Sequence, residues 1–153
     1  MIAKKKYFFI ILIILLFSTL ESAAKENVKF LSLKNNKVNL RQGPSFDYPI
    51  KFIYKKKYLP VVIIDQSETW RKIKDFENNS GWIHISQLSK KKSGINIKDN
   101  SIIYKKSTIY SKPLARLEIG RLVLILKCKK NWCKIKTGNY TGWVIKDYLW
   151  GTI

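Results

Sequence analysis

WRKIKDFENNSGWIHISQL, residues Trp70–Leu88, is the stretch that decides the fold, because the chain repeats it in its second half. Residues Trp132–Leu149 read WCKIKTGNYTGWVIKDYL. Both copies contain, in the same order, a Trp, a Lys-Ile-Lys run, a polar turn, a Gly-Trp pair and a closing Leu. The repeat predicts two copies of one structural unit.

Each copy has the pattern of a β-hairpin. Side chains alternate across a strand, so Trp70 and Lys72 share one face and Ile73 lies on the other. Polar turn residues then close the hairpin, at 78–81 in the first copy and 137–139 in the second. Beyond the N-terminal segment no stretch has a helical period, so the sequence predicts an all-β protein with short strands.

Residues 1–24 have the organisation of a secretory signal peptide. A short basic segment precedes an apolar run, Tyr7–Phe17, and the small residues Ser22 and Ala24 suit a signal peptidase. The run is too short to cross a bilayer core of roughly 30 Å comfortably. We expect export across the inner membrane to the periplasm or the exterior, with no stable membrane span after cleavage; an uncleaved N-terminal membrane anchor is the alternative.

The repeat divides the remaining chain into two small domains. The expected segments are a lead-in, a first domain, a basic linker and a second domain, at residues 25–36, 37–89, 90–100 and 101–153. The linker is polar and charged and contains a Gly. In the second domain Pro113 is aligned with Pro44, and this alignment predicts that the aromatic loop of the first copy is largely missing from the second.

The chain carries a formal net charge of +20. Basic chains bind nucleic acids through counterion release. An export signal, however, takes the protein away from the genome, and all but four of the 30 basic residues are Lys, which suits diffuse surface charge better than bidentate phosphate recognition. We therefore expect no specific nucleic-acid partner, but nonspecific contact with anionic polymers of a cell envelope.

Cys128 and Cys133 are the only cysteines of the chain. Such a pair is half of a metal site, but a metal site needs four ligands and His84 is the only His. The competing interpretation of the two cysteines is the site of a redox enzyme, although C-x-x-C spacing is absent. After export the pair is expected to form a structural disulfide across the Leu126–Ile135 hairpin. No metal and no cofactor are expected.

The element VNLRQGPSFDYPI, residues 38–50, together with W-x-K-I and GWIH, closely resembles a bacterial SH3-like (SH3b) domain. TIYSKP at residues 108–113, followed by WCKIK and YTGWVIKDYLWG, resembles a diverged member of the same family. The resemblance covers residues 37–150. It implies an all-β fold of two small SH3-like β-barrels in tandem, and a noncatalytic module of exported or envelope proteins that binds peptidoglycan or peptides.

Catalysis is poorly supported by the residues. His84 lies beside Trp82 in a predicted strand, and no G-x-S-x-G motif is present. The two cysteines lie in the other domain, so they offer no Cys–His pair with that His. We expect no catalytic residues and no enzyme activity.

Aromatic residues of the first domain form the candidate ligand site. Strand alternation puts Trp70 opposite the Ile73 face, and an aromatic ring on a polar face can stack on sugars or grip peptides. Four residues are predicted to line one groove between the aromatic loop and the Trp70 hairpin: Tyr48, Tyr54, Trp70 and Trp82. The alternative is that Trp82 and Trp143 are structural and cover the end of each barrel.

Three functional hypotheses remain open. The first is an envelope module that binds peptidoglycan, and the second is an adaptor that docks a protein partner such as a cell-wall enzyme. The third is nonspecific polyanion binding through Lys. The repeat places the aromatic residues while the lysines are scattered, and this favours the first two hypotheses over the third.

Overall fold

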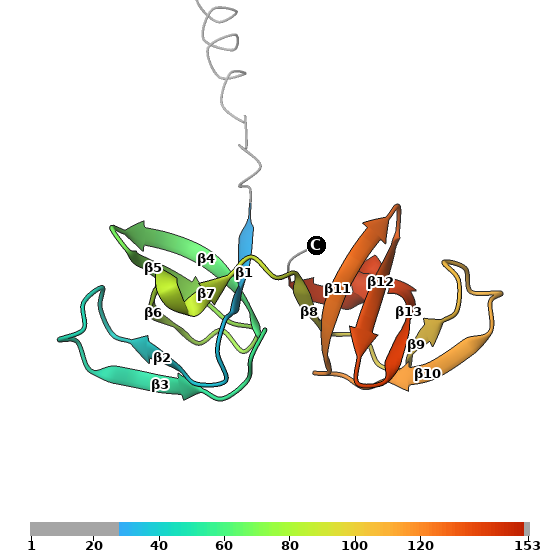
Figure 1. Ribbon diagram of the computed structural model, residues 1–153, viewed down its shortest axis with the longest axis horizontal. Helices are drawn as coiled ribbons and strands as arrows, with labels where there is room; N and C mark the ends of the chain where they lie inside the picture. The colour runs from blue at the N-terminus through green and yellow to red at the C-terminus, as the bar shows by residue number, and fades with distance from the viewer. Residues whose placement is uncertain (1–27, 152–153) are drawn as a thin grey trace, which may run out of the picture.

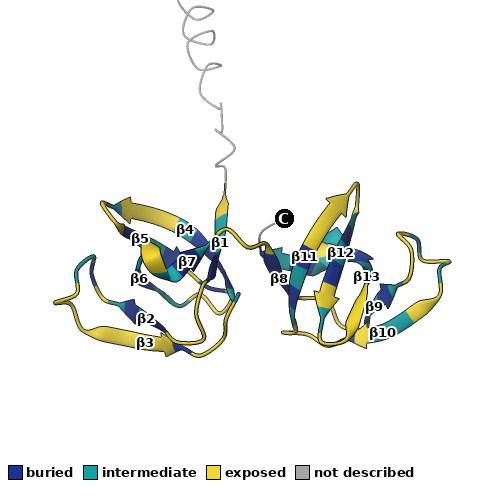
Figure 2. Cartoon of the chain, viewed as in Figure 1, coloured by how far each residue is buried: buried dark blue, intermediate teal, exposed yellow. Residues whose placement is uncertain are grey.

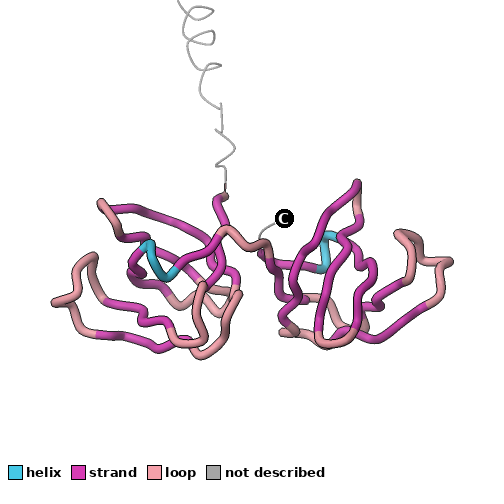
Figure 3. Tube along the Cα trace, viewed as in Figure 1, coloured by secondary structure: helices cyan, strands magenta, loops and turns pink. Residues whose placement is uncertain are grey.

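The computed structural model describes residues 28–151, which form two seven-stranded sheets (Figure 1). All the strand pairs described are antiparallel, and two short 3-10 helices accompany them (Figure 3). The all-β prediction is confirmed. The predicted signal peptide lies outside the described residues. Within residues 28–151 no helix is long and apolar enough to cross a membrane.

The first sheet has the strand order β3-β2-β6-β5-β4-β1-β7. Its elements are β1 (Lys29–Leu33), β2 (Val38–Arg41), β3 (Ile50–Tyr54), β4 (Pro60–Ser67), β5 (Trp70–Lys74), β6 (Ser80–His84), the 3-10 helix η1 (Ile85–Gln87) and β7 (Leu88–Ser89). Strands β3 and β7 form the two edges of the sheet, so strand pairing does not close a complete barrel.

The second sheet has the equivalent order, β10-β9-β13-β12-β11-β8-β14. Its elements are β8 (Ser93–Asn96), β9 (Ser101–Tyr104), β10 (Pro113–Leu117), β11 (Leu122–Lys129), β12 (Trp132–Thr137), β13 (Tyr140–Ile145), the 3-10 helix η2 (Lys146–Tyr148) and β14 (Leu149–Gly151). The repeat in the sequence is therefore a repeat of topology.

Each sheet contains one strand from a segment that the sequence analysis placed outside the two domains. Strand β1, from the predicted lead-in, pairs with β4 and β7, and β8, from the predicted linker, pairs with β11 and β14. All four residues of β8, Ser-Gly-Ile-Asn, are buried. Alternation is therefore absent, and the polar composition of this strand hides it from a search for hydrophobic periodicity.

The loop before β3 has an exact counterpart in the second domain, which corrects the predicted alignment. Arg41 lies opposite Trp82 and Ile50, while Tyr104 lies opposite Trp143 and Pro113. Pro113 is thus equivalent to Ile50 and not to Pro44. Loops 42–49 and 105–112 have the same length, and each is closed by a backbone hydrogen bond between its first and last residue. The prediction that the second copy lacks this loop is wrong.

Each domain has its own hydrophobic core, visible as the buried strands of Figure 2. The first core consists of Leu33, Val38, Leu40, Tyr54, Val61, Ile73, Ile83 and Leu88. The second consists of Ile103, Leu117, Val123, Ile125, Cys133, Ile135, Val144 and Leu149. Ile73 and Ile135 occupy matching positions in the two copies, as the repeat predicts.

The side chain of Trp150, from the second domain, packs against the first domain. Its ring packs edge-on against Phe30, with 5.1 Å between centroids, and against Phe76, with 5.8 Å. Both phenylalanines belong to the first domain, and such edge-to-face pairs stabilise an interface beyond the area they bury. The domains are therefore in contact through an aromatic side chain and not only through the chain that connects them.

The glycine of each Gly-Trp pair allows two strands to cross closely. A Cβ on Gly81 would lie 2.7 Å from the carbonyl oxygen of Arg41, and one on Gly142 would lie 2.6 Å from that of Tyr104. These distances are too short for any side chain, so glycine is required at both positions.

We expect Gly142→Ala to lower the free energy of unfolding by about 1–3 kcal/mol, because the added methyl group forces strands β13 and β9 apart. Denaturant titration followed by circular dichroism measures this loss. Thr141→Ala, at the exposed neighbouring position, is the control and should stay close to wild type. A stability of Gly142→Ala equal to that control would contradict the proposed crowding.

Candidate functional site

The candidate site lies on the side of strands β2, β6 and β5 that faces away from the core of the first domain. We call this surface the outer face. Its residues are Arg41, Trp70, Lys72, Trp82 and His84, which point to the side of the sheet opposite the core residues Leu40, Ile73 and Ile83. Cross-strand pairing arranges them in two rows, with Arg41, Trp82 and Lys72 in one row and His84 beside Trp70 in the other.

Arg41 holds the aromatic loop against this face. Its Nη1 donates hydrogen bonds to the carbonyl oxygens of Phe46, at 2.9 Å, and Tyr48, at 2.7 Å. The ring of Tyr48 also lies where a side chain on Gly43 would be, 2.6 Å from the position of its Cβ. The Arg and the Gly of the N-L-R-x-G-P element therefore shape the loop.

The loop places Phe46 over Trp70. The two ring centroids are 4.9 Å apart, and Phe46 also lies 5.3 Å from the ring of His84. Trp70 is on the face opposite Ile73, as alternation predicts, but only 6% of it is exposed because these rings cover it. Phe46 is 62% exposed, so a ligand that approaches this cluster would meet Phe46 first.

His84 is engaged locally. Its Nδ1 lies 2.8 Å from the hydroxyl oxygen of Ser86 and accepts a hydrogen bond from the backbone N–H of Ser86, which caps helix η1. The rings of Phe46 and Trp70 also lie against the imidazole, each with 5.3 Å between ring centroids. Across residues 28–151 no group of three or more His, Cys, Asp or Glu side chains could hold a metal ion.

Tyr54 lies away from the outer face. Its side chain is part of the first core, 4% exposed, and its hydroxyl donates a 2.9 Å hydrogen bond to Oδ2 of Asp75. Asp75 is itself buried and also accepts hydrogen bonds from the backbone N–H groups of Glu77 and Asn79. This network holds the turn between β5 and β6, so Tyr54 has a structural role here.

The structure thus brings together part of the predicted groove. Trp70 and Trp82 share the outer face, and Tyr48, which is 47% exposed, belongs to the loop that borders it. Tyr54 belongs to the first core and not to this face. Sequence reasoning missed Phe46. The available signal was the aromatic composition of the loop, because an aromatic ring in a loop that is fixed beside a sheet can pack over the side chains on that face.

A second groove, of about 440 Å³, lies where the two domains meet. Its lining includes Phe52, Tyr54 and Phe76 from the first domain and Ile95 and Gly120 from the second. Strand alternation within one domain cannot reveal it, because it exists only when both domains are in place.

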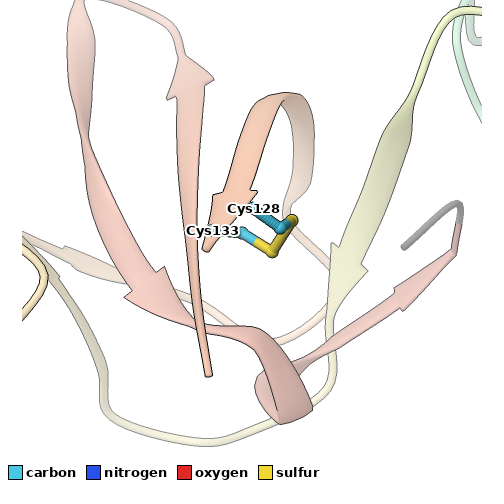
Figure 4. The surroundings of a disulfide bond; sticks show 2 residues. All are labelled: Cys128 and Cys133. Carbon is cyan, nitrogen blue, oxygen red and sulfur yellow. A yellow bond between two sulfur atoms is a disulfide. The ribbon is translucent and has the colours of Figure 1, made fainter. Parts of the chain in front are cut away.

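The predicted disulfide is present. Cys128 and Cys133 lie directly opposite each other on β11 and β12, and they are joined by a disulfide bond (Figure 4). Cys133 is buried in the second core while Cys128 is exposed. In the first domain Gln66 and Arg71 occupy the matching pair of positions, so this hairpin forms there without a cross-link.

Two antiparallel sheets of one topology, with a loop fixed by N-L-R-x-G-P and a Gly-Trp crossing, define a tandem protein of small SH3-like β-domains. The family model for the bacterial SH3 domain matches residues 34–90 and again residues 98–151. The chain belongs to this family. It contains two of its domains.

A comparison with curated proteins gives no match. Among solved structures, the chain is similar to NlpC2 from Trichomonas vaginalis, with 14% identity and a TM-score of 0.38, over 84% of this chain and 50% of that one. It is also similar to an NlpC/P60 family protein from Bacillus cereus, with 12% identity and a TM-score of 0.35, over 79% and 55%. This chain therefore spans about half the length of these proteins, and at such TM-scores the likeness supports no conclusion about its function.

Tyr54 predicts a pH dependence of stability. Burial, followed by the hydrogen bond to Asp75, raises the pKa of the Tyr54 hydroxyl above its ordinary value of 10.0. The folded state therefore favours the neutral phenol, and this contribution to stability is complete below about pH 10 and is lost as the pH rises further.

Between about pH 9 and pH 11.5, we expect the free energy of unfolding of Tyr54→Phe to fall less steeply than that of wild type, by up to about 1.4 kcal/mol per pH unit above pH 10. Urea titrations across this range measure the two slopes. Tyr48→Phe, at an exposed ring, is the matched control. Parallel slopes for Tyr54→Phe and wild type would show that the buried phenol does not govern alkaline stability.

Proposed function

We propose that this protein is an exported, noncatalytic binding module of the cell envelope that recognises peptidoglycan or its peptides. Membership of the bacterial SH3 domain family supports a binding role, and the outer face supplies the chemistry. The export step rests on the signal-peptide pattern of residues 1–24.

The observation that carries the proposal is the combination of accessible rings with cations on the outer face and on the loop that covers it. Phe46 is largely exposed and Trp82 half-buried, and Trp82 lies between Arg41 and Lys72 in the strand register. Peptidoglycan combines sugar rings, which stack on aromatic side chains, with carboxylates, which attract Lys and Arg. The net charge of +20 adds long-range attraction to an anionic wall.

The noncatalytic part of the proposal rests on the contacts made by His84, the one histidine of the chain. His84 and Ser86 are in hydrogen-bond contact, but they are two residues apart and form the cap of a short helix. A hydrolytic Ser–His pair also needs a third group that orients the imidazole. The rings of Phe46 and Trp70 flank this imidazole, and they offer no such acceptor.

A specific feature favours the adaptor as a second candidate. Strand β3 is an edge strand, and three of its apolar residues are exposed: Ile50 at 44%, Phe52 at 46% and Ile53 at 38%. An extended peptide can add to such an edge through main-chain hydrogen bonds. The equivalent strand β10 has a bulge at the same position as β3, but it begins with Pro113, a residue that disfavours strand pairing at an edge.

Co-sedimentation of the purified protein with peptidoglycan sacculi across a salt series tests the proposed function. We expect binding that persists at high salt and that weakens by at least about tenfold in the Phe46→Ala/Trp82→Ala double variant, since both rings are lost from the outer face. Tyr110→Ala, which removes a ring that is 92% exposed in the matching loop of the second domain, is the control.

Binding that disappears at moderate salt and ignores the double variant would contradict the proposal and indicate nonspecific polyanion binding. Absence of sacculus binding at low salt would contradict it as well, and would direct attention to the β3 edge and a protein partner.

A further inference from the structure

The hairpin tip beside the first Trp of each repeat has the same backbone but opposite charge. Residues 67–70 and 129–132 close their hairpins with the same register, and both tips place one residue at positive φ, Glu68 at 46° and Lys130 at 52°. The first tip reads Ser-Glu-Thr and the second Lys-Lys-Asn. One acidic side chain is thus replaced by two basic ones on an unchanged frame.

The Trp behind this tip is also covered differently. In the first domain Phe46 lies on Trp70, whereas the matching loop position of the second domain is Ile109, which is 55% exposed. Trp132 is only half-buried, and its one ring contact is with Tyr104, edge-on at 5.7 Å between centroids, among the residues that the structure describes.

An open pocket of about 350 Å³ lies beside Trp132. Its lining consists of Ser107, Lys129, Lys130, Asn131 and Trp132. This volume is at the lower end of the range of small-ligand sites. We call it the Trp132 pocket.

We propose that the Trp132 pocket binds an acidic saccharide, a sugar ring that carries a carboxylate. The proposal rests on the proposed function and names the ligand chemistry of one site within it. The indole ring offers a flat apolar surface for the sugar, and the two lysines supply positive charge that would attract the carboxylate. The Asn131 amide and the Ser107 hydroxyl are donors and acceptors suited to sugar hydroxyls.

The charge of the lining selects an anion. Lys129 and Lys130 are both exposed at the tip, and none of the lining residues is acidic. In the first domain Glu68 holds the equivalent place of Lys130 and Ser67 that of Lys129, so that tip lacks the two ammonium groups that would attract the carboxylate. The difference between the domains is therefore one of specificity, since the sheets beneath are alike.

The backbone around the pocket disfavours an extended peptide as its ligand. Lys129 is paired with Trp132 in the hairpin, and the carbonyl oxygen of Asn131 accepts a 2.8 Å hydrogen bond from the N–H of Lys146. Strand β12, which begins at Trp132, has neighbours on both sides, β11 and β13. A peptide that binds by strand addition needs a free edge, and this site has none.

Titration of the full chain with tetragalacturonate, followed by calorimetry, tests the proposal. We expect saturable binding that is weaker by at least about tenfold for the methyl-esterified tetrasaccharide, which lacks the charge, and for the Lys129→Gln/Lys130→Gln variant. Trp132→Ala should show a similar loss. The lysine variant lies at an exposed tip, so it keeps the test valid even if Trp132→Ala is destabilised.

Lys56→Gln/Lys57→Gln removes the same charge from an exposed run of the first domain and is the matched control. Three results would overturn the proposal: no saturable binding, equal binding of the methyl ester, or an equal loss in the control variant. All three would leave the proposed function standing if sacculus binding still depends on Phe46 and Trp82. If the protein binds tetragalacturonate but does not bind sacculi, the proposed function is contradicted while the acidic-saccharide site is not.

Discussion

The close crossing at the Gly-Trp pair is the constraint on which the rest of each domain depends. Gly81 lies so near the carbonyl oxygen of Arg41 that only a hydrogen atom fits between them. This approach brings β2 against β6, turns Trp82 to the outer face and places Arg41 where its guanidinium reaches the loop. The same geometry recurs at Gly142 and Tyr104, which explains why two diverged copies keep one topology.

On this shared frame a few side chains give the two domains different surfaces. In the first domain Arg41 holds the loop so that Phe46 packs on Trp70. In the second domain Tyr104 and Ile109 occupy the matching positions, and Trp132 stays partly exposed. The loops that carry these residues have the same length, so the difference arises from side-chain chemistry and not from deletion. One protein can thus present two unlike binding surfaces without any change in the order of its strands.

The sequence predicted those features that depend on alternation and spacing: the repeat, the all-β class, the disulfide and the placement of Trp70 opposite Ile73. It failed where burial does not follow hydrophobicity. Strand β8 buries Ser93 and Asn96, so no apolar pattern marks it. Tyr54 turns inward because Asp75 accepts a hydrogen bond from its hydroxyl group. Contacts between domains, such as those of Trp150, need a tertiary arrangement that no local pattern contains.

The central claim is that the two domains share one backbone topology, but that Trp70 is shielded from solvent in the first domain while Trp132 is accessible in the second. Hydroxyl-radical footprinting of the folded protein, with oxidation quantified for each Trp by mass spectrometry, tests it most directly. We expect Trp132 to be oxidised several times faster than Trp70, because Phe46 and His84 shield the latter. Equal rates at the two positions would contradict the claim.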